Sequence, residues 1–288
     1  MKKPSSFRVV LVFLCCFGFM PASVLAEDLV IPVSSLNSAP VLDGKLVDWS
    51  SQPLKIPMSK AHPGVTVDVS ELEIWAGHHG DMVYFAFRWA DESPDRQHKP
   101  WVWDDETQRY AVGSQREDRF AIQFAIDGDY DVNWLAGNEF LADMWHWKSA
   151  RSAPLGLAHD KMTIISRSAL SRAFKINSVD GSFVYIRRPS DAGEPIYSSK
   201  RYGLKESKQM PKYILNSEVS GSVADVKAGQ SWSGGFWTVE LARKLDTGNE
   251  DDVVFALGNK VRGGIAVFNR TGDSDHVISP NLVFTFER

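Results

Sequence analysis

The stretches VTVDVSELEI (residues 65–74) and MVYFAFRW (residues 82–89) decide the fold class. In both, apolar side chains recur at every second position, which is the period of a half-buried β-strand. Residues 77–80, which begin and end with glycine, read as a turn between them. The sequence therefore predicts an antiparallel hairpin over residues 65–89.

Similar alternation continues along the chain. It predicts further strands at residues 120–126, 141–147, 182–186, 236–241, 253–258 and 282–286. No stretch has a helical period longer than about two turns. Short strands separated by Gly, Asp and Pro turns are typical of an all-β, antiparallel β-sandwich. The polar, proline-containing segments 91–114 and 187–212 are expected to be long surface loops.

The first 26 residues read as a secretory signal peptide. Lys2, Lys3 and Arg8 form a positive region, an apolar run covers residues 9–20, and Ala26 offers a small residue at the cleavage position. The apolar run is too short to span a bilayer. We expect export to the periplasm, no stable membrane span after cleavage, and one mature domain at residues 27–288.

Charge and cysteine content narrow the possible functions. Loss of Lys2, Lys3 and Arg8 leaves 29 of the 32 basic residues against 36 acidic ones, so the mature net charge is about −7. An acidic domain lacks the basic footprint that nucleic-acid binding needs. Both cysteines leave with the signal, which excludes disulfides, thiolate metal sites and thioether-linked haem in the mature chain.

The segment VLDGKLVDW (residues 41–49) combines an Asp-Gly turn with a large apolar side chain, Trp49. On turn chemistry alone it is a structural hairpin. It also resembles the opening of family 9 carbohydrate-binding modules. That resemblance implies a β-sandwich of the carbohydrate-binding-module type but names no ligand.

The block DMWHWK (residues 143–148) carries the most specific chemistry. On a strand, Met144, His146 and Lys148 face one side, while Trp145 and Trp147 face the other. Thioether and imidazole are side chains that ligate haem iron. A structural role is the alternative, with methionine filling a core gap and the imidazole hydrogen-bonded.

A second imidazole, His276, follows the acidic turn GDSD (residues 272–275) just before the last expected strand. It is either a solvated loop residue or an axial metal ligand at the rim of the sandwich. The acidic turn could instead hold calcium, although its spacing matches no EF-hand. His78 and His79 lie in the turn of the first hairpin, and His78 is a further candidate for a haem or metal role.

Signatures of hydrolytic or phosphate chemistry are missing from the sequence. It contains no nucleophile elbow, phosphate-cradling loop or zinc-protease motif. Neighbouring acids such as Asp104 and Asp105 are solvated charge rather than a glycosidase pair. We therefore expect an electron-transfer or binding domain rather than an enzyme.

Several of these segments occur in the order seen in one family. They are DRFAIQF (118–124), DMWHWKSAR (143–151), FWTVE (236–240) with Arg243, VFALGN (254–259) and DHVIS (275–279). Together they resemble the haem-binding domain of ethylbenzene dehydrogenase-related proteins, also described as cytochrome c-552/DMSO reductase-like. The resemblance covers most of the mature chain.

The resemblance implies a non-covalent haem b. His276 matches the family's ligand near the C-terminus, and the second ligand would be Met144 or His146, because residues 133–140 contain no Met, His or Lys. Lys148 and Arg151 would pair with the propionates. The implied partner is a redox protein, either a DMSO reductase-class molybdenum enzyme or a cytochrome.

Two functions follow from these patterns. The first is a periplasmic haem b electron-transfer protein serving a molybdenum-dependent enzyme. The alternative is a carbohydrate-binding module of the family 9 type, resting on residues 41–49 and on Trp101 and Trp103, which we expect to be exposed for stacking on sugars.

Overall fold

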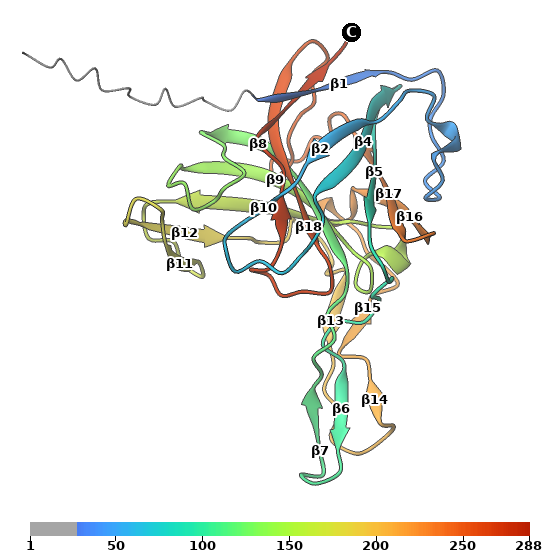
Figure 1. Cartoon of the computed structure of the whole chain (residues 1–288), viewed down its shortest axis with the longest axis vertical. Coiled ribbons are helices and arrows are strands. Elements are labelled where there is room, and N and C mark those ends of the chain that lie inside the picture. The colour runs from blue at the N-terminus through green and yellow to red at the C-terminus, as the bar shows by residue number, and fades with distance from the viewer. Residues whose placement is uncertain (1–27) are drawn as a thin grey trace, which may run out of the picture.

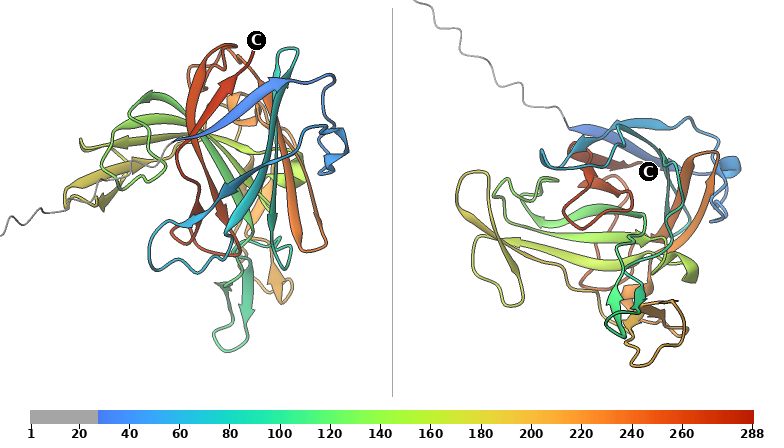
Figure 2. Two further views of the ribbon diagram at one scale, coloured as in Figure 1. Left: turned by 45° about the horizontal axis from the view of Figure 1, so that its top comes forward. Right: turned by 60° about the horizontal axis from the view of Figure 1, so that its bottom comes forward.

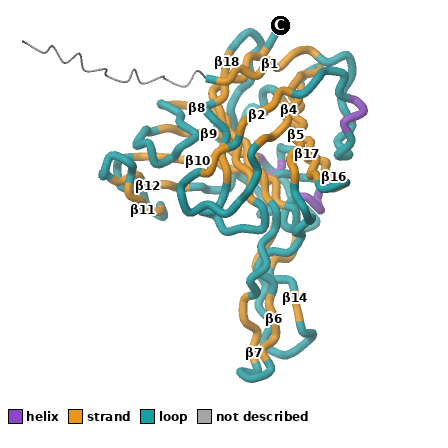
Figure 3. Tube along the Cα trace, viewed as in Figure 1, coloured by secondary structure: helices purple, strands orange, loops and turns teal. Residues whose placement is uncertain are grey.

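The computed structural model describes residues 28–288. The predicted signal peptide and both cysteines lie outside these residues. Within the described part, no helix is long and apolar enough to cross a membrane. Figure 3 shows a molecule built of strands, in which the helices are short 3-10 turns at Leu46–Asp48, Ala153–Leu155 and Ser222–Ala224.

The structure contains two large sheets that share one strand. The first runs in spatial order through β11 (Phe174–Asn177), β12 (Phe183–Arg187), β10 (His159–Ser166), β9 (Phe140–Lys148), β8 (Arg119–Gly128), β18 (Lys260–Phe268), β20 (Leu282–Phe286) and β1 (Leu29–Ser35). The second continues from β1 through β4 (Glu71–His79), β5 (Met82–Ala90), β17 (Phe236–Lys244) and β16 (Lys227–Ser233), with β2 (Leu54–Pro57) beside β4.

Strand β1 joins the two sheets. Its first five residues pair in parallel with β20, and Ser34 and Ser35 then pair in parallel with β4. Figure 2 (left) shows β1 in blue, crossing from the red strands to the cyan ones. All other pairs between these strands are antiparallel. The predicted all-β sandwich is confirmed, with β1 as the parallel exception.

The core lies between the sheets and is rich in aromatic side chains. Phe85 of β5 lies 5.8 Å from Trp145 of β9, centroid to centroid, and Trp147 lies 5.0 Å from Trp237 of β17. Because side chains alternate along a strand, this inward row on β9 leaves Met144 and His146 on the opposite, outer face of the first sheet.

The two segments expected to be loops are mostly irregular and also contain short strands. β6 (Trp101–Asp104), β7 (Arg109–Val112) and β14 (Gln209–Met210) form a small sheet, and β13 (Tyr197–Ser199) pairs with β15 (Tyr213–Leu215). Figure 1 shows that β6, β7 and β14 project from the body as an arm. Most residues of both segments lie outside strands, which agrees with the prediction of long surface loops. One short strand pair, β14 with β6, joins the two segments although they are about 100 residues apart.

Two further predictions differ from the structure. Residues 65–70 and 253–258 form no strand, although Val65, Val67 and Val69 of the first stretch and Val253 and Phe255 of the second are buried in the core. The first turn falls after His79, so His78 and His79 end β4 instead of lying in the turn. Alternate apolar side chains in these stretches do face the core, but burial alone does not require pairing with a neighbouring strand.

Candidate functional site

A pocket of about 420 Å³ opens on the outer face of the first sheet. We call it the outer-face pocket. Its floor comes from β8, β9 and β18, and its walls come from the loop 132–135, the hairpin β11–β12 and the loop before β19 (Val277–Ile278). The side chains that line it include Gln123, Trp134, Met144, His146, Phe174, Arg188, Asp273 and His276.

Met144 and His146 form part of the floor, as the alternation along β9 predicts. Cross-strand pairing places Ala121 opposite His146, and Gln123 opposite Met144. The His146 ring lies 6.0 Å from the Phe268 ring, and its Nε2 is buried without a hydrogen-bond partner. Burial, followed by the nearby Lys148 and Arg119, holds the pKa of His146 well below its usual value. His146 is therefore neutral at pH 7.

His276 reaches the same pocket from the loop before β19. Its ring lies 4.7 Å from the Phe268 ring, and its Nδ1 is buried without a partner. Burial, followed by Arg119, lowers the pKa of His276 to about 4. Two neutral imidazoles from distant parts of the sequence thus lie against the Phe268 ring. Each has one ring nitrogen that forms no hydrogen bond with a described protein group.

Aromatic and polar side chains surround the mouth of the pocket. The Trp134 indole donates to the Gln123 side-chain oxygen at 3.0 Å, and the Gln123 amide in turn donates to Thr163 at 2.6 Å. Both ends of Gln123 are therefore fixed, which orients the Trp134 ring. The Arg188 guanidinium lies 5.7 Å from that ring, and Phe174 is 64% exposed.

A second pocket of about 470 Å³ adjoins the first and shares His146, Phe174, Arg188 and Asp273 with it. We call it the cationic pocket, because eight cations line it. They are Lys99, Arg119, Lys148, Arg151, Lys161, Arg172, Arg187 and Arg188. The structure thus places Lys148 and Arg151, two of the residues predicted to bind a cofactor, here rather than beside Met144 and His276.

Contacts hold both predicted cations in place. The Lys148 Nζ lies 2.6 Å from the His159 Nδ1 and 3.3 Å from the Tyr197 hydroxyl. Burial, followed by neighbouring Arg151 and Lys161, holds the pKa of Lys148 well below its usual value. Arg151 forms an ion pair with the buried carboxylate of Glu117.

Other residues singled out in the sequence lie elsewhere. Trp103 is 5% exposed, so the prediction of an exposed sugar-stacking tryptophan was wrong for it. Trp101 is partly buried and donates to the Lys200 carbonyl. Trp49 is buried, and its indole donates to Glu240 at 2.8 Å. His78 bonds to the Glu287 carbonyl oxygen at 3.1 Å, outside both pockets.

The carboxylates of the acidic turn at residues 272–275 bind other groups of the protein. Asp275 accepts hydrogen bonds from the backbone N–H and the hydroxyl of Thr66, at 2.7 and 2.5 Å. Asp273 pairs with Arg119. The turn therefore fixes the loop that carries His276, and the two carboxylates serve different partners rather than one shared cation.

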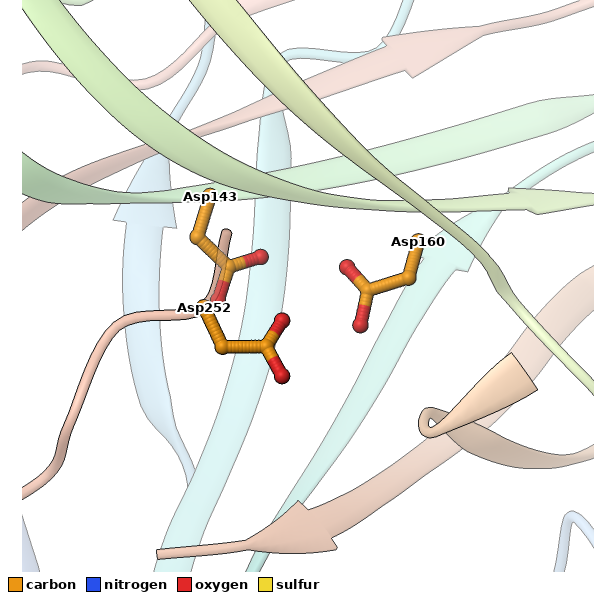
Figure 4. Close-up of side chains that lie close together, drawn as sticks. All are labelled: Asp143, Asp160 and Asp252. Carbon is orange, nitrogen blue, oxygen red and sulfur yellow. The ribbon is translucent and has the colours of Figure 1, made fainter. Parts of the chain in front are cut away.

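A buried acidic cluster behind the first sheet was not predicted. Figure 4 shows the carboxylates of Asp143 (β9), Asp160 (β10) and Asp252 close together. Arg243 of β17 lies among them, since its Nη1 is 2.5 Å from Asp143, 3.0 Å from Asp252 and 3.8 Å from Asp160. The guanidinium thus takes the place that a metal ion would need, and the cluster is a buried ion-pair network.

The buried carboxyl of Asp191, at the edge of this cluster, should make the stability of the protein depend on pH. Burial, followed by Asp143, raises the pKa of Asp191 from 3.8 to about 8. Between these values the folded protein holds a proton that the unfolded chain releases, so stability falls as pH rises from about 4 to 8. We expect Asp191→Asn to melt higher than the wild type at pH 8, by circular dichroism, and to flatten the decline.

The exposed Asp246, which accepts from the Gly248 N–H, provides the control. Asp246→Asn is expected to follow the wild-type curve from pH 5 to 9. Parallel curves for wild type and Asp191→Asn would show that Asp191 is ionised in the folded protein at pH 8.

The outer-face pocket offers donor groups of the kind that the haem b implied by the sequence would need. Unpartnered imidazole nitrogens at His146 and His276, with the Met144 thioether beside them, are groups that ligate haem iron. The adjoining cations could receive carboxylates. The residues present therefore fit a haem b in chemical type, and the cofactor stays a prediction.

Comparison with known proteins gives one family and several distant structures. A family model described as ethylbenzene dehydrogenase matches residues 47–277. No curated protein matches the chain. The chain is similar to a candidate carbohydrate-binding protein from Bacteroides uniformis, with 10% identity over 90% of this chain and 99% of that one, and a TM-score of 0.44.

Family 9 carbohydrate-binding modules from Caldicellulosiruptor kristjanssonii are also similar. One, in complex with glucose, has 11% identity, covering 88% of this chain and 85% of that chain, with a TM-score of 0.38. One in complex with cellotriose has 10% identity, covering 90% and 93%, with a TM-score of 0.38.

These structures correct the function predicted from the sequence. The main prediction, a periplasmic haem b electron-transfer protein serving a molybdenum enzyme, is contradicted, because the similar solved structures are described as carbohydrate binders. The prediction of electron transfer relied on motifs that identify the family, and a family's fold can carry more than one function.

Proposed function

We propose that this chain, which belongs to the ethylbenzene dehydrogenase family, is a non-catalytic, exported carbohydrate-binding protein, and that the saccharide lies in the outer-face pocket. The role of the domain is then to hold a ligand, and the rigid first sheet provides the floor on which the ligand rests.

The mouth of the outer-face pocket carries this proposal. Trp134 and Phe174 offer aromatic faces, on which the apolar face of a sugar ring can stack. Asn133, Arg188 and Asp273 offer polar groups at the same mouth, which can exchange hydrogen bonds with sugar hydroxyls. An apolar surface with a few placed polar groups is the usual composition of a small-molecule site.

Truncating the two aromatic side chains tests the proposal. Trp134→Ala and Phe174→Ala are each expected to weaken binding of an oligosaccharide by roughly tenfold, because each removes one stacking face. The affinity is to be measured by isothermal titration calorimetry with the mature protein, using ligands first selected from a glycan array.

Phe183→Ala is the matched control. Phe183 lies on the same hairpin and is 44% exposed, but it does not line the outer-face pocket. This variant should bind as the wild type does. The proposal would be contradicted if no glycan on the array bound, or if all three variants lost affinity equally.

Haem b in the same pocket stays a prediction, supported by the unpartnered nitrogens of His146 and His276. A bound haem would supply a redox-active iron. An absorption spectrum after addition of haemin separates the two ligands. A Soret band that His276→Ala alters would favour the cofactor, whereas a colourless protein that binds oligosaccharide would exclude it from this role.

A further inference from the structure

The cationic pocket departs from the charge balance of the rest of the chain. The whole sequence has a formal net charge of −4, yet eight cationic side chains converge on one cavity of about 470 Å³. Asp273 is the only carboxylate among the residues that line it. Like charges brought together repel one another, so this arrangement costs free energy unless something opposite binds there.

Most of these cations have no acidic partner. Arg119 and Arg188 pair with Asp273, and Arg151 pairs with Glu117. Within residues 28–288, no carboxylate oxygen lies within 4.0 Å of the remaining five, which are Lys99, Lys148, Lys161, Arg172 and Arg187. The surplus positive charge is therefore not neutralised by the protein itself.

Hydrogen-bonding contacts fix the side chains of two of the unpaired lysines. Lys148 is 3% exposed and contacts His159 and Tyr197, and the Lys161 Nζ donates to the Arg188 carbonyl at 2.9 Å. Burial, followed by Arg188, lowers the pKa of Lys161 to about 8, and an anion beside it would raise that value again. Fixed, partly desolvated cations interact strongly with an anion.

Flat rings accompany the charges. The Arg151 guanidinium lies 5.2 Å from the Tyr197 ring and 5.1 Å from the Tyr213 ring, and Phe174 is shared with the outer-face pocket. A ligand that suits both pockets thus has ring-shaped units and several separate anionic groups. A chain of hexuronic acid units has this composition, since each ring carries one carboxylate.

We propose that the cationic pocket receives the carboxylates of an acidic, hexuronate-containing saccharide whose neighbouring unit lies in the outer-face pocket. This inference rests on the proposed function, and it names the class of saccharide. Arg172 and Lys161 are two unpaired cations that a carboxylate can reach, because Arg172 is exposed and Lys161 is half-buried. Planar guanidinium groups match carboxylates with two parallel hydrogen bonds.

The test compares hexuronate oligosaccharides with their fully methyl-esterified forms, by calorimetry on the mature protein. Esterification removes the charge and keeps the sugar chain. The acid form is expected to bind at least about tenfold more tightly than the ester. Added salt should weaken binding of the acid form but not of the ester. Lys161→Met and Arg172→Met should each lower the affinity for the acid form by about tenfold and leave the affinity for the ester unchanged.

Lys175→Met is the control, since Lys175 lies on β11, 3.7 Å from the Phe183 ring, and does not line either pocket. An equal loss with Lys175→Met would show general charge attraction and overturn the pocket assignment. Equal affinities for acid and ester would overturn this inference while leaving the proposed function intact. Preference for sulfated over carboxylated sugars would also overturn it, and no binding of any saccharide would overturn both proposals.

Discussion

Replacing Arg243 by methionine is expected to lower the free energy of unfolding by about 3–5 kcal/mol, the usual cost of removing one partner from a buried ion pair. Arg243 is 0% exposed, and its Nη1 is the cation among Asp143, Asp160 and Asp252. Its Nη2 also donates to the Val253 carbonyl at 2.5 Å, so the loss also releases the segment that carries Asp252.

Urea unfolding of Arg243→Met and of a surface control measures this effect. Arg262 pairs with Asp28 at 3.1 Å while its side chain stays 47% exposed, so Arg262→Met is expected to cost about 1 kcal/mol or less. A loss below about 1 kcal/mol for Arg243→Met would mean that the aspartates are protonated in the folded protein and do not depend on the guanidinium.

Replacing Trp145 by alanine is expected to cost about 3–5 kcal/mol, because it leaves a cavity between the two sheets. The Trp145 side chain is fully buried, and its ring lies 5.0 Å from Phe124, 5.8 Å from Phe85 and 5.9 Å from Phe255. These partners come from β8, β5 and the irregular segment 253–258, so one truncation loosens three parts of the core.

Trp101→Ala provides the comparison for this second variant. Trp101 lies on the arm, away from the core of the sandwich, and is expected to contribute about 1 kcal/mol or less. Equal losses for Trp145→Ala and Trp101→Ala in urea unfolding would contradict the assignment of β9 to the centre of the core.

Much of the fold could be predicted from the sequence, since the period of two along β5, β8 and β9 identifies both the strands and their buried faces. The alternation at residues 143–148 correctly separates Trp145 and Trp147 from Met144 and His146. Periodicity does not show which strands pair with each other. Residues 101–112 form a local hairpin, and residues 209–210 join it only because the fold brings a distant polar segment alongside β6.

The candidate site could be predicted only in part. Met144, His146 and His276 were singled out from their chemistry, and all three line the outer-face pocket. Trp134 could not be recognised from the sequence, because its orientation depends on a hydrogen bond to Gln123 of β8, which lies on another element.

The cationic pocket was missed for a similar reason. Lys161 and Arg172 come from separate segments, and their charges look like ordinary surface charge until the sheet places them side by side. The sequence offered one weak signal. In the stretch HDK at the start of β10, His159 and Lys161 fall on the face that carries His146 and Met144 across the strand pair.

The central claim is that a saccharide occupies the outer-face pocket, and a crystal structure of the mature protein with the tightest-binding oligosaccharide tests it most directly. The account predicts a sugar ring against Trp134 and Phe174, with a carboxylate beside Lys161 or Arg172. A sugar found instead on the arm beside Trp101, with the outer-face pocket holding none, would contradict the account.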